Sequence, residues 1–268
     1  MLYLISTPIG NLEDISYRAV RILSSCSYIL CEDTRNSKIL LDHLSIRKEL
    51  KSFHKFSEKR KEDEVIRDLE DGKEIALISD GGTPLLCDPG KSLVLECINK
   101  NIKYTAIPGA CSLIDAFVLS GLDIPFQFIG FLNKGAELEK DLKKILCYNG
   151  VTICFESPKR VVSTMRLLKK MDSEREVVIV REMTKKFEDV IRGKAHEMEN
   201  LLKDKTKGEM VILISKKDFD FKNFELNEML DILKSSGLSS MEALKMAAKL
   251  RKESKRELYK KTIKDKLC

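Results

Sequence analysis

A short apolar segment recurs six times along the chain, each time followed by a polar or Gly/Pro-rich turn and then by a segment with helical spacing. The six segments are 2–6 (LYLIS), 28–31 (YILC), 74–79 (EIALIS), 104–107 (YTAI), 152–155 (TICF) and 177–181 (VVIVR). Strands that alternate with helices predict an α/β fold with a largely parallel sheet covered by helices. Ligands of such sheets bind beyond the carboxyl ends of the strands, so we expect the turns after these segments to form one shared pocket.

The segments are expected to fall into two α/β domains. Residues 119–132 contain the breakers Gly121 and Pro125, which favours a domain boundary near residues 109–121. We therefore predict one domain at 1–109 and a second at 110–217.

The pattern weakens after Gly193. A helix is expected at 195–202 and a last strand at 210–215, followed by a charged stretch without a clear period, 216–225, which predicts a linker. Beyond it we predict a helical module at 225–268, with short helices at 226–234, 241–250 and 253–264.

The positive charge of the chain is concentrated in this module. The formal net charge is +6, from 48 basic and 42 acidic residues. Residues 237–268 contain ten Lys or Arg and four acidic residues, which gives +6 by itself, so the rest of the chain is neutral. A neutral body with a basic C-terminal segment indicates either a polyanionic partner, most simply nucleic acid, or a merely solvated surface.

Cysteine and histidine spacing gives no sign of a metal site. The eight cysteines include no C-x-x-C pair, and the three histidines do not stand at zinc-ligand spacings. Cys31 and Cys154 lie inside apolar segments and are expected to be small buried side chains in a reducing compartment. The sequence has no apolar run of about 18 residues and no signal-peptide pattern, so we expect a cytoplasmic protein without a membrane span.

The segment 79–90, SDGGTPLLCDPG, follows a predicted strand. Gly81 and Gly82 allow the backbone to approach a ligand or adopt positive φ, and the neighbouring Asp80 and Thr83 favour a site over a plain turn. The segment is neither a P-loop nor a G-x-G-x-x-G fingerprint. The segment therefore gives no motif evidence for triphosphate hydrolysis or for Rossmann-type hydride transfer.

Two further motifs are ambiguous when taken singly. The segment 31–35, CEDTR, fits either a capped helix start with a surface ion pair or a site. The segment 181–188, REMTKKFE, fits either a salt-bridged loop or a site.

In their order and spacing, seven motifs together resemble one family. They are STPIGNLEDISYRA (6–19), CEDTRNSKILLDHLSI (31–46), SDGGTPLLCDPG (79–90), IPGACS (107–112), FESPKR (155–160), REMTKKFEDVIRG (181–193) and KGEMVILI (207–214). Over residues 2–214 the chain is similar to the RsmI family of bacterial 16S rRNA ribose 2'-O-methyltransferases, within the tetrapyrrole methylase superfamily. Its tail resembles the small C-terminal module of that family.

This resemblance implies a two-domain tetrapyrrole-methylase-like fold (class III methyltransferase) with a small helical module, working as a homodimer. It implies S-adenosylmethionine as cofactor, bound between the domains, and a decoding-centre cytidine of 16S rRNA in the small ribosomal subunit as substrate. Carried over by motif, the cofactor contacts are Pro8, Gly81, Gly82, Thr83, Leu86, Cys111, Ser112, Phe155, Glu156 and Met183. The family commonly has Ala where Gly81 stands, a change that a turn should tolerate.

Methyl transfer from a sulfonium mainly requires alignment of the acceptor oxygen and exclusion of water, and it needs no metal. A carboxylate or lysine near the ribose hydroxyl would assist by accepting its proton. The candidates are Glu156, Glu182, Asp33 and Lys185, of which we assign Glu156 and Lys185 as catalytic. His54 is at least as compatible with a structural role as with a general base.

Substrate RNA is expected to be held by Arg35, Lys159, Arg160 and the C-terminal module, through phosphate contacts. Two alternatives remain open. One is methylation of a small tetrapyrrole precursor, which leaves the basic module without a use. The other is a non-catalytic RNA-binding protein built on a methylase fold.

Overall fold

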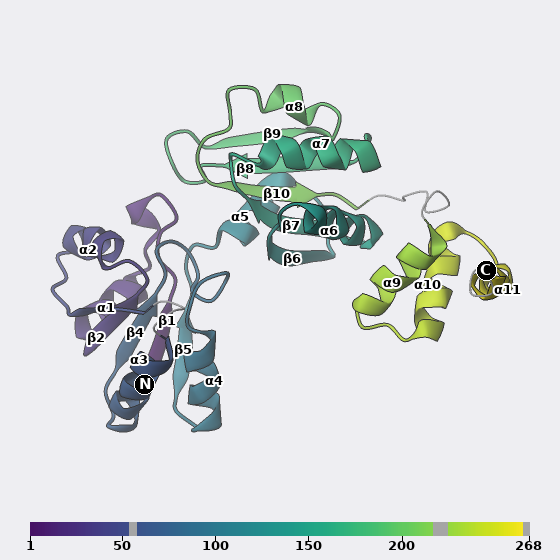
Figure 1. The fold of residues 1–268 in the computed structure, drawn as a ribbon. Helices are drawn as coiled ribbons and strands as arrows, with labels where there is room; N and C mark the ends of the chain where they lie inside the picture. The colour runs from purple at the N-terminus through teal and green to yellow at the C-terminus, as the bar shows by residue number, and fades with distance from the viewer. Residues whose placement is uncertain (54–57, 217–224, 265–268) are drawn as a thin grey trace.

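The computed structural model describes residues 1–53, 58–216 and 225–264, and it contains two α/β units followed by a group of three helices (Figure 1). His54 and most of the predicted linker at 216–225 lie outside the described residues. None of the described helices combines the length and the apolar character needed to cross a membrane.

The first unit is a five-stranded parallel sheet with the strand order β3-β2-β4-β1-β5. Its strands are β1 (Leu2–Ile5), β2 (Tyr28–Cys31), β3 (Leu50–Ser52), β4 (Ile75–Ile78) and β5 (Tyr104–Ile107). One face packs on α1 (Tyr17–Ser25) and α2 (Thr34–His43), and the other on α3 (Glu58–Glu70) and α4 (Lys91–Asn99). A short 3-10 helix, Leu12–Asp14, follows β1. β2 and β4 are buried on both faces, which explains their unbroken apolar sequences.

The second unit is a five-stranded mixed sheet with the strand order β6-β7-β10-β8-β9. Its strands are β6 (Phe126–Phe131), β7 (Val151–Glu156), β8 (Glu176–Arg181), β9 (Asp189–Lys194) and β10 (Met210–Ile214). Of these pairings, only β6 with β7 is parallel. The prediction of a largely parallel sheet is therefore wrong for this unit, because the short connection between β8 and β9 forms an antiparallel hairpin and cannot hold a crossover helix.

Three strands were not predicted, namely β3, β6 and β9, and all three lie at sheet edges. Their residues are half-buried or exposed at most positions. Such strands lack the continuous apolar run by which the central strands were recognised.

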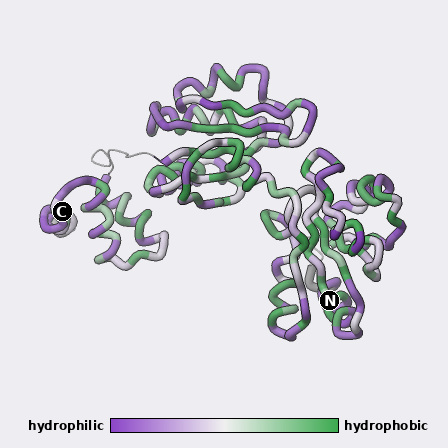
Figure 2. The backbone as a smooth tube through the Cα atoms, turned by 180° about the vertical axis from the view of Figure 1, so that it is seen from behind, coloured by the Kyte–Doolittle hydropathy of each residue, from purple (hydrophilic) through white to green (hydrophobic). Residues whose placement is uncertain are grey.

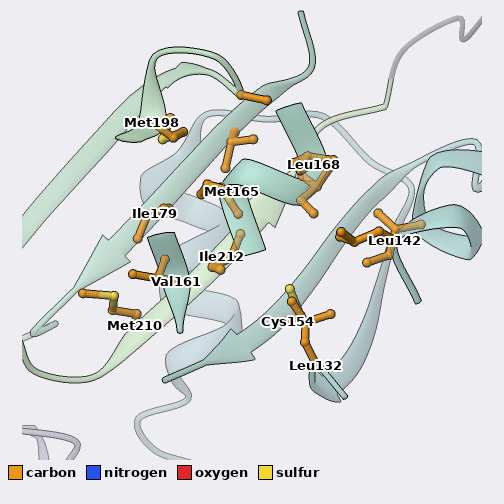
Figure 3. Close-up of a cluster of buried hydrophobic side chains, with 14 of the residues drawn as sticks. Leu132, Leu142, Cys154, Val161, Met165, Leu168, Ile179, Met198, Met210 and Ile212 are labelled. Carbon is orange, nitrogen blue, oxygen red and sulfur yellow. The ribbon is translucent and has the colours of Figure 1, made fainter. Parts of the chain in front are cut away.

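Four helices cover the second sheet. α5 (Ser112–Ser120) packs on one face, against β7, β8 and β10. α6 (Ala136–Cys147), α7 (Val161–Met171) and α8 (Met198–Leu201) enclose the other face, and α8 is shorter than the helix predicted at 195–202. In the core drawn in Figure 3, Met165 and Leu168 of α7 lie over Ile179 and Ile212 of the sheet. In Figure 2 the central strands are mainly hydrophobic, whereas the helices carry both hydrophobic and hydrophilic stretches.

The C-terminal module contains α9 (Leu226–Ser235), α10 (Ser240–Arg251) and α11 (Lys255–Lys264), close to the three predicted helices. Ser239 and Glu242 form a reciprocal capping box at the start of α10. The helices share a small core of their own, which includes Leu233, Leu244 and Leu258. The module also contacts α6, where Lys143 pairs with Glu228 and Cys147 packs on the module core.

Candidate active site

A cavity of about 960 Å³ lies between the two α/β units, and both units contribute to its wall. The first unit supplies the loops after β1 and β4, and the second supplies the start of α5 and the turns at the ends of β7, β8 and β10. All the positions predicted to contact the cofactor line this cavity, as does Lys185; they are Pro8, Gly81, Gly82, Thr83, Leu86, Cys111, Ser112, Phe155, Glu156 and Met183. The turns expected to form one pocket are thus brought together.

Backbone hydrogen bonds hold the turn after β4 against the loop after β1. The Thr7 N–H donates to the Gly82 carbonyl (2.9 Å), and the Gly82 N–H donates to the Thr7 carbonyl (3.0 Å). The Ser79 hydroxyl also donates to the Gly82 carbonyl (2.9 Å). Gly82 has a backbone φ of +86°, a conformation that residues with a side chain rarely adopt. The glycine at this position is therefore required by the turn itself.

Thr83 joins this turn to the chain that leads into the second unit. Its hydroxyl donates to the Ala110 carbonyl (3.2 Å) and shares a hydrogen bond with the Ser6 hydroxyl (3.0 Å). The Thr83 side chain thus fixes the segment before α5 next to β1.

The start of α5 forms part of the opposite wall. Cys111 is the N-cap residue, and its side chain makes no capping hydrogen bond. Cys111, Ser112 and Leu113 line the cavity, so the positive end of the helix dipole faces it. Asp115, in the first turn of α5, already accepts a hydrogen bond from the Cys111 N–H (3.3 Å) at this end.

Apolar side chains form the adjacent wall. Phe155 is half-buried, and its ring centroid lies 5.0 Å from that of Phe128 and 5.2 Å from that of Phe131. Met183 and Leu86 line the same cavity.

The structure argues against Glu156 as a general base. Its side chain is 0% exposed, although the residue borders the cavity. One carboxylate oxygen accepts hydrogen bonds from the Ser157 N–H (2.7 Å) and from Nε of Arg160 (2.7 Å), and the other accepts from the Thr164 hydroxyl (2.7 Å). With both oxygens engaged, this carboxylate anchors the start of α7 and is not available to a substrate hydroxyl.

Arg160 is likewise turned inward, so its assignment to RNA binding is corrected. Besides its ion pair with Glu156, the guanidinium donates to the carbonyls of Leu132 (2.7 Å) and Asn133 (3.4 Å). Lys159 and Arg35 are exposed, Arg35 at 88% of its side chain, and neither lines the cavity.

Lys185 is held in an ion-paired cluster, which argues against the base role that we assigned to it. Its Nζ donates to Glu209 (2.9 Å) and to Glu182 (3.1 Å). Burial alone would lower the pKa of Lys185, but these hydrogen bonds outweigh burial and raise the pKa above its usual value. The Glu209 N–H also donates to the Glu182 carboxylate (3.0 Å), and this hydrogen bond, together with the one from Lys185, lowers the pKa of Glu182.

Asp33 lies in a smaller hollow of about 380 Å³ beside the cavity. Arg35 donates to both of its carboxylate oxygens, at 3.1 and 2.7 Å, and lowers the pKa of Asp33 to about 2. Asp80 borders both hollows and accepts hydrogen bonds from the Asp33 N–H and the Asn36 amide, each at 3.1 Å.

Several lining residues were missed by the sequence assignments, among them Asn36, Phe131, Gly208 and Glu209. Gly208 and Glu209 stand in the KGEMVILI motif, so the motif that carried the resemblance also contained this signal. A Cβ atom at Gly208 would lie 2.3 Å from the Glu182 carboxyl group, which explains the glycine. Phe131 had no signal of its own, because β6 was not recognised as a strand.

Comparison with known proteins identifies the family. Residues 1–199 match the tetrapyrrole (corrin/porphyrin) methylases. The ribosomal RNA small subunit methyltransferase I of Mycoplasmopsis pulmonis is 42% identical over 215 residues, covering 79% of this chain and 96% of that protein. Its counterpart in Buchnera aphidicola subsp. Schizaphis graminum is 38% identical over 277 residues, covering 99% of this chain and 96% of that protein.

Solved structures share the fold at low sequence identity. Diphthine synthase matches with a TM-score of 0.66 and 14% identity, covering 87% of this chain and 94% of that one. A uroporphyrin-III C-methyltransferase from Thermus thermophilus, solved with S-adenosyl homocysteine, matches with a TM-score of 0.55 and 16% identity, covering 79% and 96%. From the sequence match, the chain belongs to the ribosomal RNA small subunit methyltransferase I family, whose S-adenosylmethionine-dependent enzymes have the tetrapyrrole methylase fold.

Proposed function

We propose that this protein methylates the ribose 2'-oxygen of a cytidine in the decoding centre of 16S rRNA, in the cytoplasm, with S-adenosylmethionine as the methyl donor. The observation that carries the proposal is the cavity between the two units, in which the motifs shared with the family meet. Family membership supports methylation of small-subunit rRNA, and the resemblance of the motifs supports the ribose and the cytidine.

The cavity suits the cofactor in size and chemistry. Its volume of about 960 Å³ is large enough for an amino acid joined to a nucleoside. The start of α5 would hold the carboxylate, the backbone around Gly82 would lie along the methionine part, and Phe155 with Met183 would pack on the adenosine. The residues present therefore fit S-adenosylmethionine.

When bound, the cofactor supplies a methyl group that is already activated on a positively charged sulfur. The task left to the chain is to align the acceptor oxygen and to exclude water. Leu86, Cys111 and Phe155 make part of the wall apolar, which does not oppose the loss of positive charge during transfer. Lys185 holds the turn after β8 to the turn before β10, through Glu182 and Glu209, and so shapes the cavity as an ion-paired cation.

Ribose methylation mapped by mass spectrometry in 16S rRNA tests this function. Cells lacking the protein are expected to lose one 2'-O-methyl group on a decoding-centre cytidine, and purified protein with S-adenosylmethionine should restore it on their small subunits. A methyl group lost from a base, or no change in the rRNA, would contradict the proposal.

The C-terminal module supplies RNA affinity in this proposal and is not needed for the chemistry. The relatives from Mycoplasmopsis pulmonis and Thermotoga maritima are matched over 96% and 99% of their own length, yet they cover only 79% and 81% of this chain. The part of this chain that these two relatives do not match is about one fifth of its length, which agrees with the length of the segment after residue 216. Exposed cations among the described residues of the module are Lys234, Lys245, Lys249, Lys252, Lys255, Arg256 and Lys260.

Deletion of residues 225–268 is expected to weaken binding to small ribosomal subunits by about tenfold or more at moderate salt, because several phosphate contacts are lost. The dependence of affinity on salt should also become shallower. Filter binding across a salt series measures both quantities. S-adenosylmethionine binding should stay unchanged in calorimetry, and Lys100→Ala, on the body surface, serves as the charge control. Equal RNA affinity of the truncated and full chains would contradict the assignment.

Apolar residues at the surface of the second unit support a homodimer. Ile114 and Val118 of α5 and the nearby Ile124 are exposed, Val118 and Ile124 at 72%. We expect sedimentation equilibrium to give a dimer for the unmodified chain and a monomer for Val118→Asp. A monomer at tens of micromolar for the unmodified chain would exclude this surface as a dimer interface.

A further inference from the structure

Phe131 lines the cavity without being buried in it. The residue ends β6, and it is 62% exposed although its ring contacts that of Phe155. A largely exposed ring gains little from the protein core, so its main contact surface remains open to an occupant of the cavity.

A register shift in β6 turns this ring toward the cavity. Phe128 pairs with Ile153 and Phe131 pairs with Phe155, so β6 contains one more residue than β7 between these pairs. In a regular strand, residues three apart point to opposite faces, whereas here both rings contact Phe155. Gly130, at a φ of +73°, permits the irregular backbone. Bulges of this kind commonly re-aim a side chain beside an active site.

The backbone that follows Phe131 is fixed on two sides. The Leu132 N–H donates to the Phe155 carbonyl (3.2 Å), and Arg160 donates to the carbonyls of Leu132 and Asn133. Arg160 is in turn held by the buried Glu156. The ring is therefore exposed on a rigid support, which lowers the entropic cost of binding a flat group against it.

We propose that Phe131 stacks on the base of the nucleotide whose ribose is methylated; this inference rests on the proposed function. To place its ribose inside the cavity, the nucleotide must leave the stack of neighbouring bases, which costs stacking energy. Aromatic side chains restore such stacking for single-stranded RNA bases, whatever the base. Phe155 is more buried than Phe131, and in this proposal it packs on the adenosine of the cofactor and not on the RNA base.

Phe131→Ala is expected to raise the KM for unmethylated small subunits by roughly tenfold, with a much smaller change in kcat. The Kd for S-adenosylmethionine should stay within about twofold of the unmodified chain, since the ring does not contact the cofactor in this proposal. Phe131→Tyr keeps the ring and should retain the original KM. Tyr104→Ala removes an exposed aromatic residue at the start of β5 and serves as the control.

A second arm uses an RNA fragment that contains the methylated nucleotide, with and without its base. The base should strengthen binding to the unmodified chain and should give no advantage with Phe131→Ala. A normally folded Phe131→Ala with unchanged KM would overturn the proposal, and so would a Kd for S-adenosylmethionine raised in place of the KM. If the unmodified chain fails to methylate small subunits at all, the proposed function is wrong, which is a different result.

Discussion

Gly82→Val is expected to abolish or severely weaken S-adenosylmethionine binding. The φ of +86° at this position disfavours any side chain, and a β-branched one most strongly. A Cβ atom would lie 3.1 Å from Cγ2 of Ile9, which lines the cavity, so this close contact would force Ile9 to shift. It would also strain the paired hydrogen bonds between Thr7 and Gly82 that hold the two loops together.

Isothermal titration calorimetry measures the effect, and we expect a loss of affinity of at least about 100-fold, equivalent to about 2.7 kcal/mol. Gly81→Ala is the matched control, because a Cβ atom there would meet the Pro8 carbonyl at an ordinary contact distance of 3.5 Å. It should bind normally, in agreement with the alanine that the family commonly has at this position. Thermal unfolding of each variant separates loss of the pocket from loss of the fold. Normal cofactor binding by folded Gly82→Val would place the cofactor elsewhere.

The sequence predicted the central strands and the convergence of the motif turns on one cavity, because both depend on local pattern. β2, β4, β7, β8 and β10 are buried by helices on both faces, and their apolar runs reflect this directly. The turn at Gly82 was found because its backbone conformation demands glycine. Elements that depend on tertiary context were missed, as the edge strands β6 and β9 show.

The roles of charged residues were the least predictable part of the site. Glu156 and Arg160 stand four residues apart, and this spacing is equally typical of an ion pair inside a helix start and of two site residues. Sequence cannot distinguish a carboxylate that faces a cavity from one that turns behind it. The same holds for Lys185, whose Nζ donates a hydrogen bond to Glu209, a residue 24 positions away in the sequence.

Glu156→Ala is expected to destabilise the protein strongly. Removing this carboxylate leaves the Thr164 hydroxyl and part of the Arg160 guanidinium without their partner in a buried region. Breaking a buried ion pair on one side typically costs about 3–5 kcal/mol. In a protein of this size the midpoint of thermal unfolding should fall by roughly 10 °C.

Differential scanning fluorimetry of Glu156→Ala beside Glu199→Ala tests this expectation. Glu199 pairs with Arg166 at the surface, so the control removes the same kind of ion pair from solvent and should cost at most about 1 kcal/mol. Glu156→Gln preserves the shape and one acceptor, and we expect it to fall between the two. If Glu156→Ala kept its unfolding temperature and its S-adenosylmethionine affinity but lost methyl transfer, the carboxylate would act on the substrate after all. The anchoring role predicts instead that the unfolding temperature falls most. Without Glu156, Arg160 is no longer held against the Leu132 carbonyl, and the end of β6 loses its support.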